Sequence, residues 1–333
     1  MGSTDVTVIG VGVMGVNHVH AVSDHPQLNL ASVVDLDEQR AEEVADRYGA
    51  DNGLVDYETA LDNADAAVVA TPESVHAEQG HAALDRGVDL LLEKPIAETV
   101  EEARTLADRA PDDIVTGASF ILRYDPAYVK ACRAVTEGEL GPVVSVRAQR
   151  SITAESSNHR AEHRDHPLFY MNIHDIDAMT WCVDEKVKEV VGIERRGSLE
   201  DIDLPDATQA LLTFADGTAG VLEGYGVLPP DLPGGIQASL DVVGEDGTAS
   251  VETPGNAVTV HSGSIDRPDT RHWPVVNDRM DGAVRRQIDR FADTIAGRAD
   301  GMAATLETAA EAQIVAETIR QAIQSGERLS VTY

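Results

Sequence analysis

Lysine is scarce in this chain, and basic residues are outnumbered: 26 Lys and Arg stand against 58 Asp and Glu, for a formal net charge of −32. The acids are spread along all 333 residues and alternate with regular strand and helix patterns, which disordered acidic proteins lack. Such a surface repels nucleic acids and anionic membranes, so we expect neither as a partner. We expect instead a folded, halophilic protein, because molar salt screens surface self-repulsion.

Cysteine and long apolar runs are also lacking. Cys132 and Cys182 stand singly and far apart, without metal or redox spacing, so we expect two reduced thiols in or near a core. No apolar run approaches the ~20 residues of a membrane span, and no basic and apolar leader precedes the first strand pattern. The sequence thus predicts a soluble, cytoplasmic protein, with 42% hydrophobic residues to build two domains.

The chain does contain a glycine-rich turn, placed between a strand pattern over residues 5–10 and a helix pattern. Gly10 allows a tight turn, Gly12 lets the backbone approach a pyrophosphate, and Gly15 lets helix and strand pack closely. The helix N-terminus attracts the phosphates. The residues predicted to hold a dinucleotide here are Gly10, Gly12, Val13, Met14 and Gly15.

An acid follows the second strand pattern, which covers residues 28–34. Asp35 lies 20 residues after Gly15, where a carboxylate accepts hydrogen bonds from ribose hydroxyls and repels a 2′-phosphate. The spacing favours NAD as the cofactor, with NADP as the alternative.

Strand and helix patterns then alternate through the first half of the chain. Strands are expected at 65–72, 88–92 and 114–117, and helices at 37–48, 75–86 and 98–109. This alternation predicts an α/β fold with a doubly wound parallel sheet. Ligands of such sheets bind beyond the carboxyl ends of the strands.

The segment Glu93-Lys94-Pro95 at a strand end, together with the glycine turn, resembles the Gfo/Idh/MocA family, named for glucose–fructose oxidoreductase, inositol dehydrogenase and rhizopine catabolism. Further segments agree with this resemblance, at 35–41, 70–76, 123–126 and 138–142. The resemblance implies additional cofactor contacts from Thr71, Pro72, His76, Glu93 and Lys94.

The resemblance also implies a domain organisation. Residues 1–120 would form a dinucleotide-binding Rossmann domain. Residues 121–333 would form an α+β domain for substrate and oligomer contacts, with a large open, mostly antiparallel sheet and a last helix that packs back on the first domain. An exposed sheet face needs covering, so we expect a homodimer or homotetramer through that sheet.

The second half fits this architecture on its own terms. Strand patterns occur at 143–149, 187–195, 207–214, 218–226, 238–243, 249–252 and 257–261. Asp216-Gly217 and Asp246-Gly247 are strong hairpin turns. Two long helices are expected at about 278–297 and 305–325, and Ile288, Phe291 and Ile295 recur at the spacing of a core-facing stripe.

Lys94 is the main catalytic candidate. By similarity, it would bind the substrate hydroxyl and relay its proton. A free lysine titrates near ~10.4, and partial desolvation lowers that toward ~7–8, where lysine acts as a base. The alternative is an anchor for a phosphate or carboxylate. A cis bond before Pro95, as in relatives, would aim Lys94 inward.

A second cluster runs from Tyr170 through His174 to Asp177 and begins a helix that extends to Trp181. The family commonly has an Asp one helical turn before the His. Here His174 matches, but Tyr170 stands at the Asp position. Tyr170 either contacts the substrate oxygen or only packs, and Asp177 is placed to orient the His174 ring.

Other polar residues are weaker candidates for substrate contact. Arg123 and Arg147 fit substrate binding or structural ion pairs equally well. The loop before the second cluster contains His159, His163 and His166, whose loose spacing favours a substrate-reading loop over a metal site. We expect no metal.

The predicted activity is that of an NAD(P)-dependent dehydrogenase acting on CH–OH groups of a sugar, cyclitol or sugar derivative. Hydride transfer requires a nicotinamide held against the C–H bond and a group that moves the hydroxyl proton. Two alternatives remain open: an NAD-retaining glycosidase, which some relatives are, and a non-catalytic dinucleotide sensor.

Overall fold

The computed structural model describes residues 3–161, 166–232, 234–255, 258–261 and 265–333, without the side chains of 159–161 and 266. The chain forms two compact units: Met1–Asp125 with Arg271–Ala310, and Pro126–Thr270 with Glu311–Tyr333. The first unit is therefore not a single consecutive segment. Residues 271–310 belong to the first unit because apolar side chains of the helix over residues 282–295 pack into the core of that unit.

The first unit contains a six-stranded sheet in the order β3-β2-β1-β4-β5-β6, and all neighbouring strands are parallel. This arrangement confirms the predicted Rossmann fold, whose order reverses between β1 and β4. The strands are β1 (Thr4–Ile9), β2 (Leu28–Val34), β3 (Asn52–Leu54), β4 (Ala66–Val69), β5 (Asp89–Leu92) and β6 (Thr116–Ala118).

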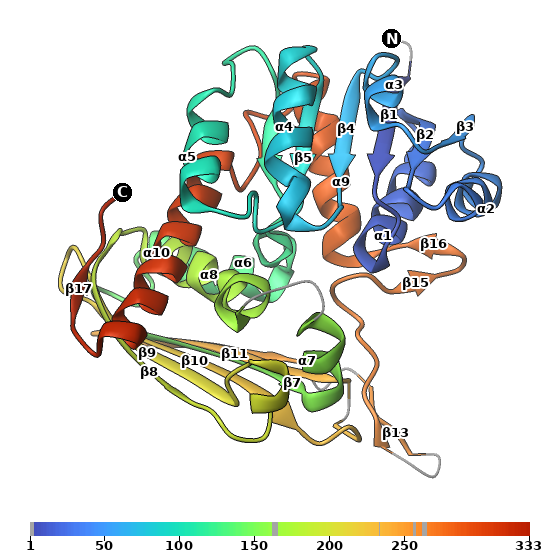
Figure 1. Ribbon diagram of the computed structural model, residues 1–333. Coiled ribbons are helices and arrows are strands. Elements are labelled where there is room, and N and C mark those ends of the chain that lie inside the picture. The colour runs from blue at the N-terminus through green and yellow to red at the C-terminus, as the bar shows by residue number, and fades with distance from the viewer. Residues whose placement is uncertain (1–2, 162–165, 233, 256–257, 262–264) are drawn as a thin grey trace. The chain divides into compact units, whose positions relative to one another are not determined.

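Helices connect and flank these strands (Figure 1). They are α1 (Val13–Ser23), α2 (Glu38–Tyr48), α3 (Tyr57–Leu61), α4 (His76–Asp85), α5 (Val100–Asp108) and α9 (Gly282–Ile295), with the short turns η1 (Glu73–Val75) and η2 (Ile121–Tyr124). A hairpin of β15 (Val275–Val276) and β16 (Arg279–Met280) precedes α9. Ile288 and Phe291 of α9 are fully buried beside α1, as the predicted stripe requires.

Local sequence explains where the helices of this unit start and stop. Asp37 caps α2 by accepting the Arg40 N–H, and Gly49 ends the helix in the left-handed conformation. Thr99 and Glu102 form a reciprocal capping box on α5.

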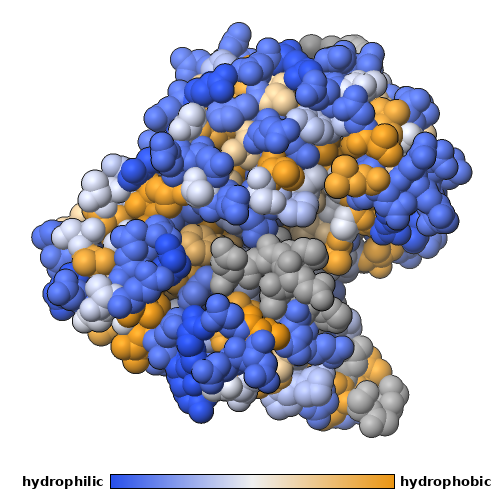
Figure 2. Space-filling view, viewed as in Figure 1, coloured by the Kyte–Doolittle hydropathy of each residue, from blue (hydrophilic) through white to orange (hydrophobic). Residues whose placement is uncertain are grey.

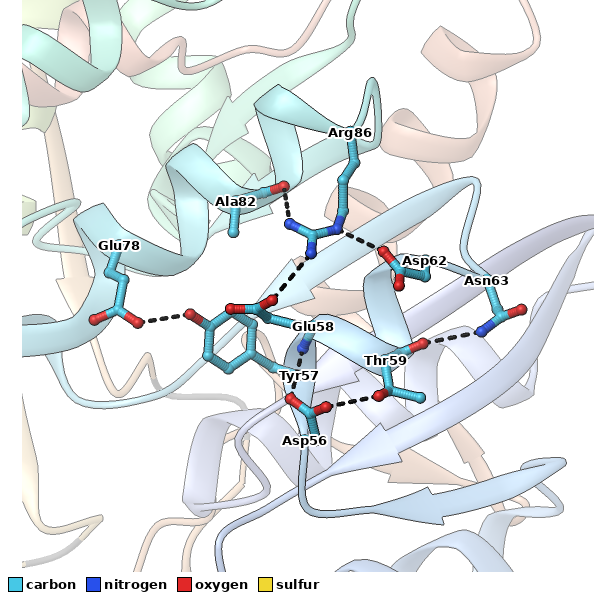
Figure 3. A network of polar contacts seen from close by, with 9 residues as sticks. All are labelled: Asp56, Tyr57, Glu58, Thr59, Asp62, Asn63, Glu78, Ala82 and Arg86. Carbon is cyan, nitrogen blue, oxygen red and sulfur yellow. Dashed lines mark hydrogen bonds and ion pairs between the residues drawn. The ribbon is translucent and has the colours of Figure 1, made fainter.

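The sequence patterns did not reveal α3, which is held to α4 by side chains (Figure 3). The Tyr57 hydroxyl donates to Glu78 at 2.6 Å, and Arg86 pairs with Glu58 and Asp62. The hydrogen bond with Glu78 raises the pKa of Tyr57 to about 12. These exposed contacts orient α3 but stabilise the fold little.

The second unit contains a seven-stranded sheet in the order β12-β11-β7-β10-β9-β8-β17. Only β7 and β10 pair in parallel, so the predicted large, mostly antiparallel sheet is confirmed. The strands are β7 (Val143–Thr153), β8 (Val187–Arg195), β9 (Ala207–Phe214), β10 (Ala219–Leu228), β11 (Ile236–Gly244), β12 (Thr248–Thr253) and β17 (Leu329–Ser330). A separate hairpin joins β13 (Val260–His261) to β14 (Ile265–Asp266), and residue 257 of the predicted strand lies outside the described residues.

The helices α6 (Pro126–Thr136), α7 (Ala154–Ala161) and α8 (Ile173–Val183) contact the sheet (Figure 1), and the turns η3 (Leu168–Asn172) and η4 (Glu200–Ile202) also belong to this unit. The helix α10 (Leu306–Ser325) belongs to this unit from Glu311 onward, and its Ile323 lies against Gly192 of β8. None of the helices described is long and apolar enough to cross a membrane.

The two cysteines contradict the expectation of reduced thiols. Cys132 of α6 and Cys182 of α8 form a disulfide with their Cα atoms 4.4 Å apart. Both side chains are buried. Sequence separation gave no hint of the pairing, because two helices that are distant in the chain pack against each other in the fold.

Candidate functional site

The glycine turn lies between β1 and α1, and two of its three glycines are required by close contacts within the protein. Gly10 has a φ of +86°, and a Cβ there would lie 2.8 Å from the Ala70 carbonyl oxygen. A Cβ on Gly15 would overlap the Gly10 carbonyl, whereas one on Gly12 would point into open space. The open side of the turn is therefore the side a ligand can approach.

The N-terminus of α1 fits a dinucleotide pyrophosphate. Its cap is Gly12, and its first turn carries no acidic residue and no side-chain cap. Val13 beside it is 83% exposed. The turn thus offers backbone N–H groups and the positive end of a helix dipole to a phosphate. Dinucleotide contacts of Gly10, Gly12, Val13, Met14 and Gly15 stay predictions.

Asp35 stands at the end of β2 next to this turn. One carboxylate oxygen accepts the Val11 N–H at 3.0 Å and the other accepts the Asp37 N–H at 3.1 Å. Each oxygen keeps a second lone pair with which to accept a ribose hydroxyl. The geometry agrees with the predicted cofactor contact.

Lys94 follows β5 and is 8% exposed. The peptide bond to Pro95 is cis, as predicted. The neighbouring Glu93 is 6% exposed, and its carboxylate accepts hydrogen bonds from His18 at 2.9 Å and Ser119 at 2.7 Å. Burial opposes ionisation of Glu93, but His18, Lys94 and Ser119 outweigh it and lower its pKa to about 2.

The turn after β4 is joined to this segment through His76. One ring nitrogen lies 2.7 Å from the Thr71 carbonyl oxygen and the other lies 2.7 Å from the Pro95 carbonyl oxygen. The Thr71 hydroxyl donates to Gln79 at 2.6 Å, while Pro72 is exposed. His76 is only 1% exposed, and both of its ring nitrogens contact backbone carbonyl oxygens.

The second predicted cluster lies in the second unit. Tyr170 belongs to the π-helical turn η3, and His174 belongs to the first turn of α8. Tyr170 is 2% exposed and packs with Ile152 and Met171, whereas His174 is partly exposed. The packing of Tyr170 agrees with the structural alternative, and Asp177 is buried.

A buried ion pair fixes the start of α8. Arg150 of β7 contacts both carboxylate oxygens of Asp175, with N–O distances of 2.8–3.1 Å. Burial alone would lower the pKa of Arg150, but the Asp175 carboxylate raises it above its ordinary value. The Asn172 amide also donates to the Glu223 carbonyl at 3.2 Å. These contacts hold the backbone on both sides of His174.

The weaker candidates have structural partners. Arg123 donates to the Ala303 carbonyl at 2.6 Å, and Arg147 bonds Glu223 at 2.7 Å. His166 is buried beside Glu194. His163 and the side chain of His159 lie outside the described residues. Among the residues that are described, no three potential metal ligands cluster.

Sequence reasoning did not single out His18, Arg150 and Asp175. His18 stands three residues after Gly15 on the buried side of α1, and Arg150 interrupts the apolar buried positions of β7. A charged or polar residue within an apolar pattern could therefore have indicated a buried polar contact. The sequence pattern does not identify the partner in that contact, because the partner is distant in the chain.

Known families match both units. Residues 4–116 match the model described as an oxidoreductase family with an NAD-binding Rossmann fold, and residues 128–250 match the Gfo/Idh/MocA C-terminal domain. An inositol 2-dehydrogenase of Rubrobacter xylanophilus is 29% identical over 76% of this chain and 72% of its own length. The scyllo-inositol 2-dehydrogenase (NAD(+)) of Bacillus subtilis is 26% identical over 74% and 73%, respectively.

Among solved structures, scyllo-inositol dehydrogenase from Lactobacillus casei, with bound NAD(H) and scyllo-inositol, has the same fold. Its TM-score is 0.85 at 18% identity, with 98% of this chain and 99% of that chain covered. Together with the parallel sheet, the glycine turn and the Glu93–Pro95 segment, the two domain matches identify the chain as a member of the Gfo/Idh/MocA family and as an NAD-dependent oxidoreductase.

Proposed function

We propose that this enzyme oxidises a CH–OH group of a cyclitol or a related sugar with NAD. The glycine turn beside Asp35, built to accept an NAD pyrophosphate and ribose, is the observation that carries the proposal. The inositol dehydrogenases described above support the substrate class. Substrate binding is assigned to the second unit, which carries His174.

Bound NAD supplies the hydride acceptor for the substrate carbon. In our proposal, the Lys94 amine takes the hydroxyl proton as the carbonyl forms, and releases it to solvent afterwards. His174, in the second unit, is proposed to hydrogen-bond the substrate. Tyr170 has a packing role in our proposal, in line with its burial against Ile152 and Met171. Replacing Tyr170 with Phe should then leave kcat within about threefold, and a loss of more than 100-fold would make its hydroxyl catalytic.

The test of the proposed function is a substrate panel. Purified protein in molar KCl is offered NAD with inositols, aldoses, uronic acids and amino sugars, and NADH formation is followed by absorbance. A parallel assay with glycosides measures release of free sugar. NADH formation in step with substrate consumption supports the dehydrogenase. Free sugar without net NADH would instead indicate a glycosidase, and NADH binding without turnover would indicate a sensor.

We also propose that a second copy of the chain covers the open face of the large sheet. Ile193 and Leu211 on that face are 65% and 58% exposed, and the Arg147–Glu223 pair lies farther along it. Exposed apolar side chains at neighbouring strands are typical of an interface. Light scattering in molar salt should give twice or four times the chain mass. Leu211→Arg should yield monomers, and a monomeric parent protein would refute the interface.

The acidic surface supports a halophilic origin. Figure 2 shows hydrophilic side chains over most of the viewed face, in keeping with 58 acids among 333 residues. We propose that the fold needs salt to screen its self-repulsion, since the Debye length falls from ~10 Å at 0.1 M to ~3 Å at 1 M. The melting temperature should rise steeply between 0.1 and 2 M KCl, and a flat dependence would refute the proposal.

We propose a cytoplasmic location, because the reaction draws on a dinucleotide pool. The Cys132–Cys182 disulfide argues for the opposite location, since disulfides are rare in reducing compartments, so the location has to be measured. Fractionation of cells, with thiols alkylated at lysis, should place the protein inside. Recovery of the active enzyme from the medium alone would contradict the location.

A further inference from the structure

Two buried histidines hold the segment that carries Lys94. His18 of α1 bonds the carboxylate of the preceding residue, Glu93, at 2.9 Å. His76 of α4 bonds the carbonyl of the following residue, Pro95, at 2.7 Å. His18 is 0% exposed and His76 is 1% exposed. Lys94 therefore lies between two residues that are each fixed by a different helix.

The Glu93 carboxylate is held from three directions. One oxygen accepts His18 and the Ser119 hydroxyl, and the other accepts the backbone N–H of Lys94 at 3.2 Å. Burial raises the pKa of Glu93, but the hydrogen bonds from His18 and Ser119 and the charge of Lys94 outweigh burial, and a pKa of about 2 keeps the carboxylate ionised at neutral pH. A fixed negative charge thus stands beside Lys94, and the His18 hydrogen bond draws on one of its oxygens.

His76 ties two loops together. Its other ring nitrogen lies 2.7 Å from the carbonyl of Thr71, in the turn after β4. A carbonyl only accepts hydrogen bonds, so two such bonds require an N–H on both nitrogens. Burial outweighs the two carbonyls and the charges of Glu93 and Glu73, and lowers the pKa of His76 below its ordinary value. The neutral ring has one N–H, so it donates to one of the two carbonyls while it lies between the ends of β4 and β5.

We propose that His18 and His76 are positioning residues for Lys94: His18 sets the charge beside the amine through Glu93, and His76 fixes the place of the segment. The inference rests on the proposed role of Lys94 in proton transfer. The two histidines differ in how they act. A change at His18 or Glu93 should alter the pH at which Lys94 loses its proton. A change at His76 should alter only the position of the Lys94 amine.

The experiment compares pH profiles of kcat/KM for oxidation, which report the titration of groups in the free enzyme. The variants are Glu93→Gln, His18→Phe, His76→Phe and His76→Gln, with Lys94→Ala run in parallel. His25→Phe is the matched control, because His25 is a buried histidine of the same unit that bonds Asp289 and Gln27 instead. Dissociation constants for NADH and melting temperatures show whether each variant is folded.

Glu93→Gln removes the negative charge, so the ascending limb of the profile should move to lower pH by about one unit. His18→Phe removes a hydrogen bond to the Glu93 carboxylate, so more of its negative charge acts on Lys94 and the limb should move to higher pH. Both His76 variants should lower kcat by about 10- to 100-fold, as expected for a misplaced base. The ascending limb of their pH profiles should stay at the pH of the parent enzyme.

Unchanged limbs in Glu93→Gln and His18→Phe, with rate losses no larger than that of His25→Phe, would overturn the inference and leave the histidines a structural role. Isosteric Glu93→Gln keeps the test decisive if His18→Phe does not fold. Full activity in Lys94→Ala would have a different meaning, because it would overturn the proposed function itself.

Discussion

The two units hold their functional side chains in different ways. In the first unit, side chains hold the segment of Lys94 by its backbone: Glu93 accepts the Lys94 N–H and His76 contacts the Pro95 carbonyl. In the second unit, side chain pairs with side chain to hold the helix that carries His174, through the Arg150–Asp175 pair and the Cys132–Cys182 disulfide. The first unit should therefore be sensitive to changes in backbone geometry, and the second to loss of buried partners.

The sharpest test of backbone control is a pair of glycine substitutions in one turn. Gly15→Ala places a Cβ on the Gly10 carbonyl, so the free energy of unfolding should fall by more than about 4 kcal/mol. Gly12→Ala meets nothing within 4 Å, so stability should change by less than about 0.5 kcal/mol while NADH affinity falls at least about tenfold. Urea unfolding and NADH titration measure both. Equal destabilisation by the two variants would contradict this account of the turn.

In the second unit, Arg150→Met should have the largest effect. It leaves Asp175 buried without its cation, which should lower the free energy of unfolding by about 3–5 kcal/mol. The double variant Arg150→Met/Asp175→Leu removes both charges and should recover much of the loss. Chemical denaturation of the parent, Arg150→Met, Asp175→Leu and the double variant gives the coupling energy. A double variant no better than Arg150→Met would argue against the ion pair as the source of the effect.

The disulfide should contribute somewhat less. Cys132→Ala/Cys182→Ala opens a loop with a sequence separation of 50, and loop-closure entropy predicts a loss of about 2–4 kcal/mol. Because both cysteines lie in the second unit, NADH binding at the first unit should persist at moderate denaturant. Circular dichroism and NADH fluorescence, followed in parallel, check this. Simultaneous loss of both signals at the same denaturant concentration would show that the units unfold together.

The smallest expected effect is at Asp35. Asp35→Ser removes the ribose acceptor and the repulsion of a 2′-phosphate, so NADH affinity should fall about tenfold while NADPH affinity rises. Arg40, which reaches the Val11 carbonyl at 3.4 Å, is available nearby as a cation. Titrations with both cofactors measure the ratio of affinities. Equal losses for NADH and NADPH would mean that Asp35 only supports the turn through its bond to Val11.

The difference between local backbone patterns and long-range side-chain pairs also explains which features could be predicted from the sequence. The glycine turn, the Asp35 spacing and the alternation of strands and helices predicted the Rossmann sheet, because local patterns encode backbone geometry. Short β3 and α3 left no periodic pattern. The pairings Cys132–Cys182, Arg150–Asp175 and His18–Glu93 could not be predicted, since each joins residues that only the folded chain brings together.

The most direct test of the central claim compares two of the four lysines. Lys94 is 8% exposed at the end of β5, whereas Lys130 is exposed on α6 and pairs with Glu139. Single-turnover NADH formation is measured for Lys94→Ala and Lys130→Ala with a saturating inositol or sugar substrate. The account predicts that Lys94→Ala loses about 10²–10⁴-fold in rate with NADH affinity retained, while Lys130→Ala matches the parent. Equal rates for the two variants would contradict the assignment of Lys94 as the proton-transfer group.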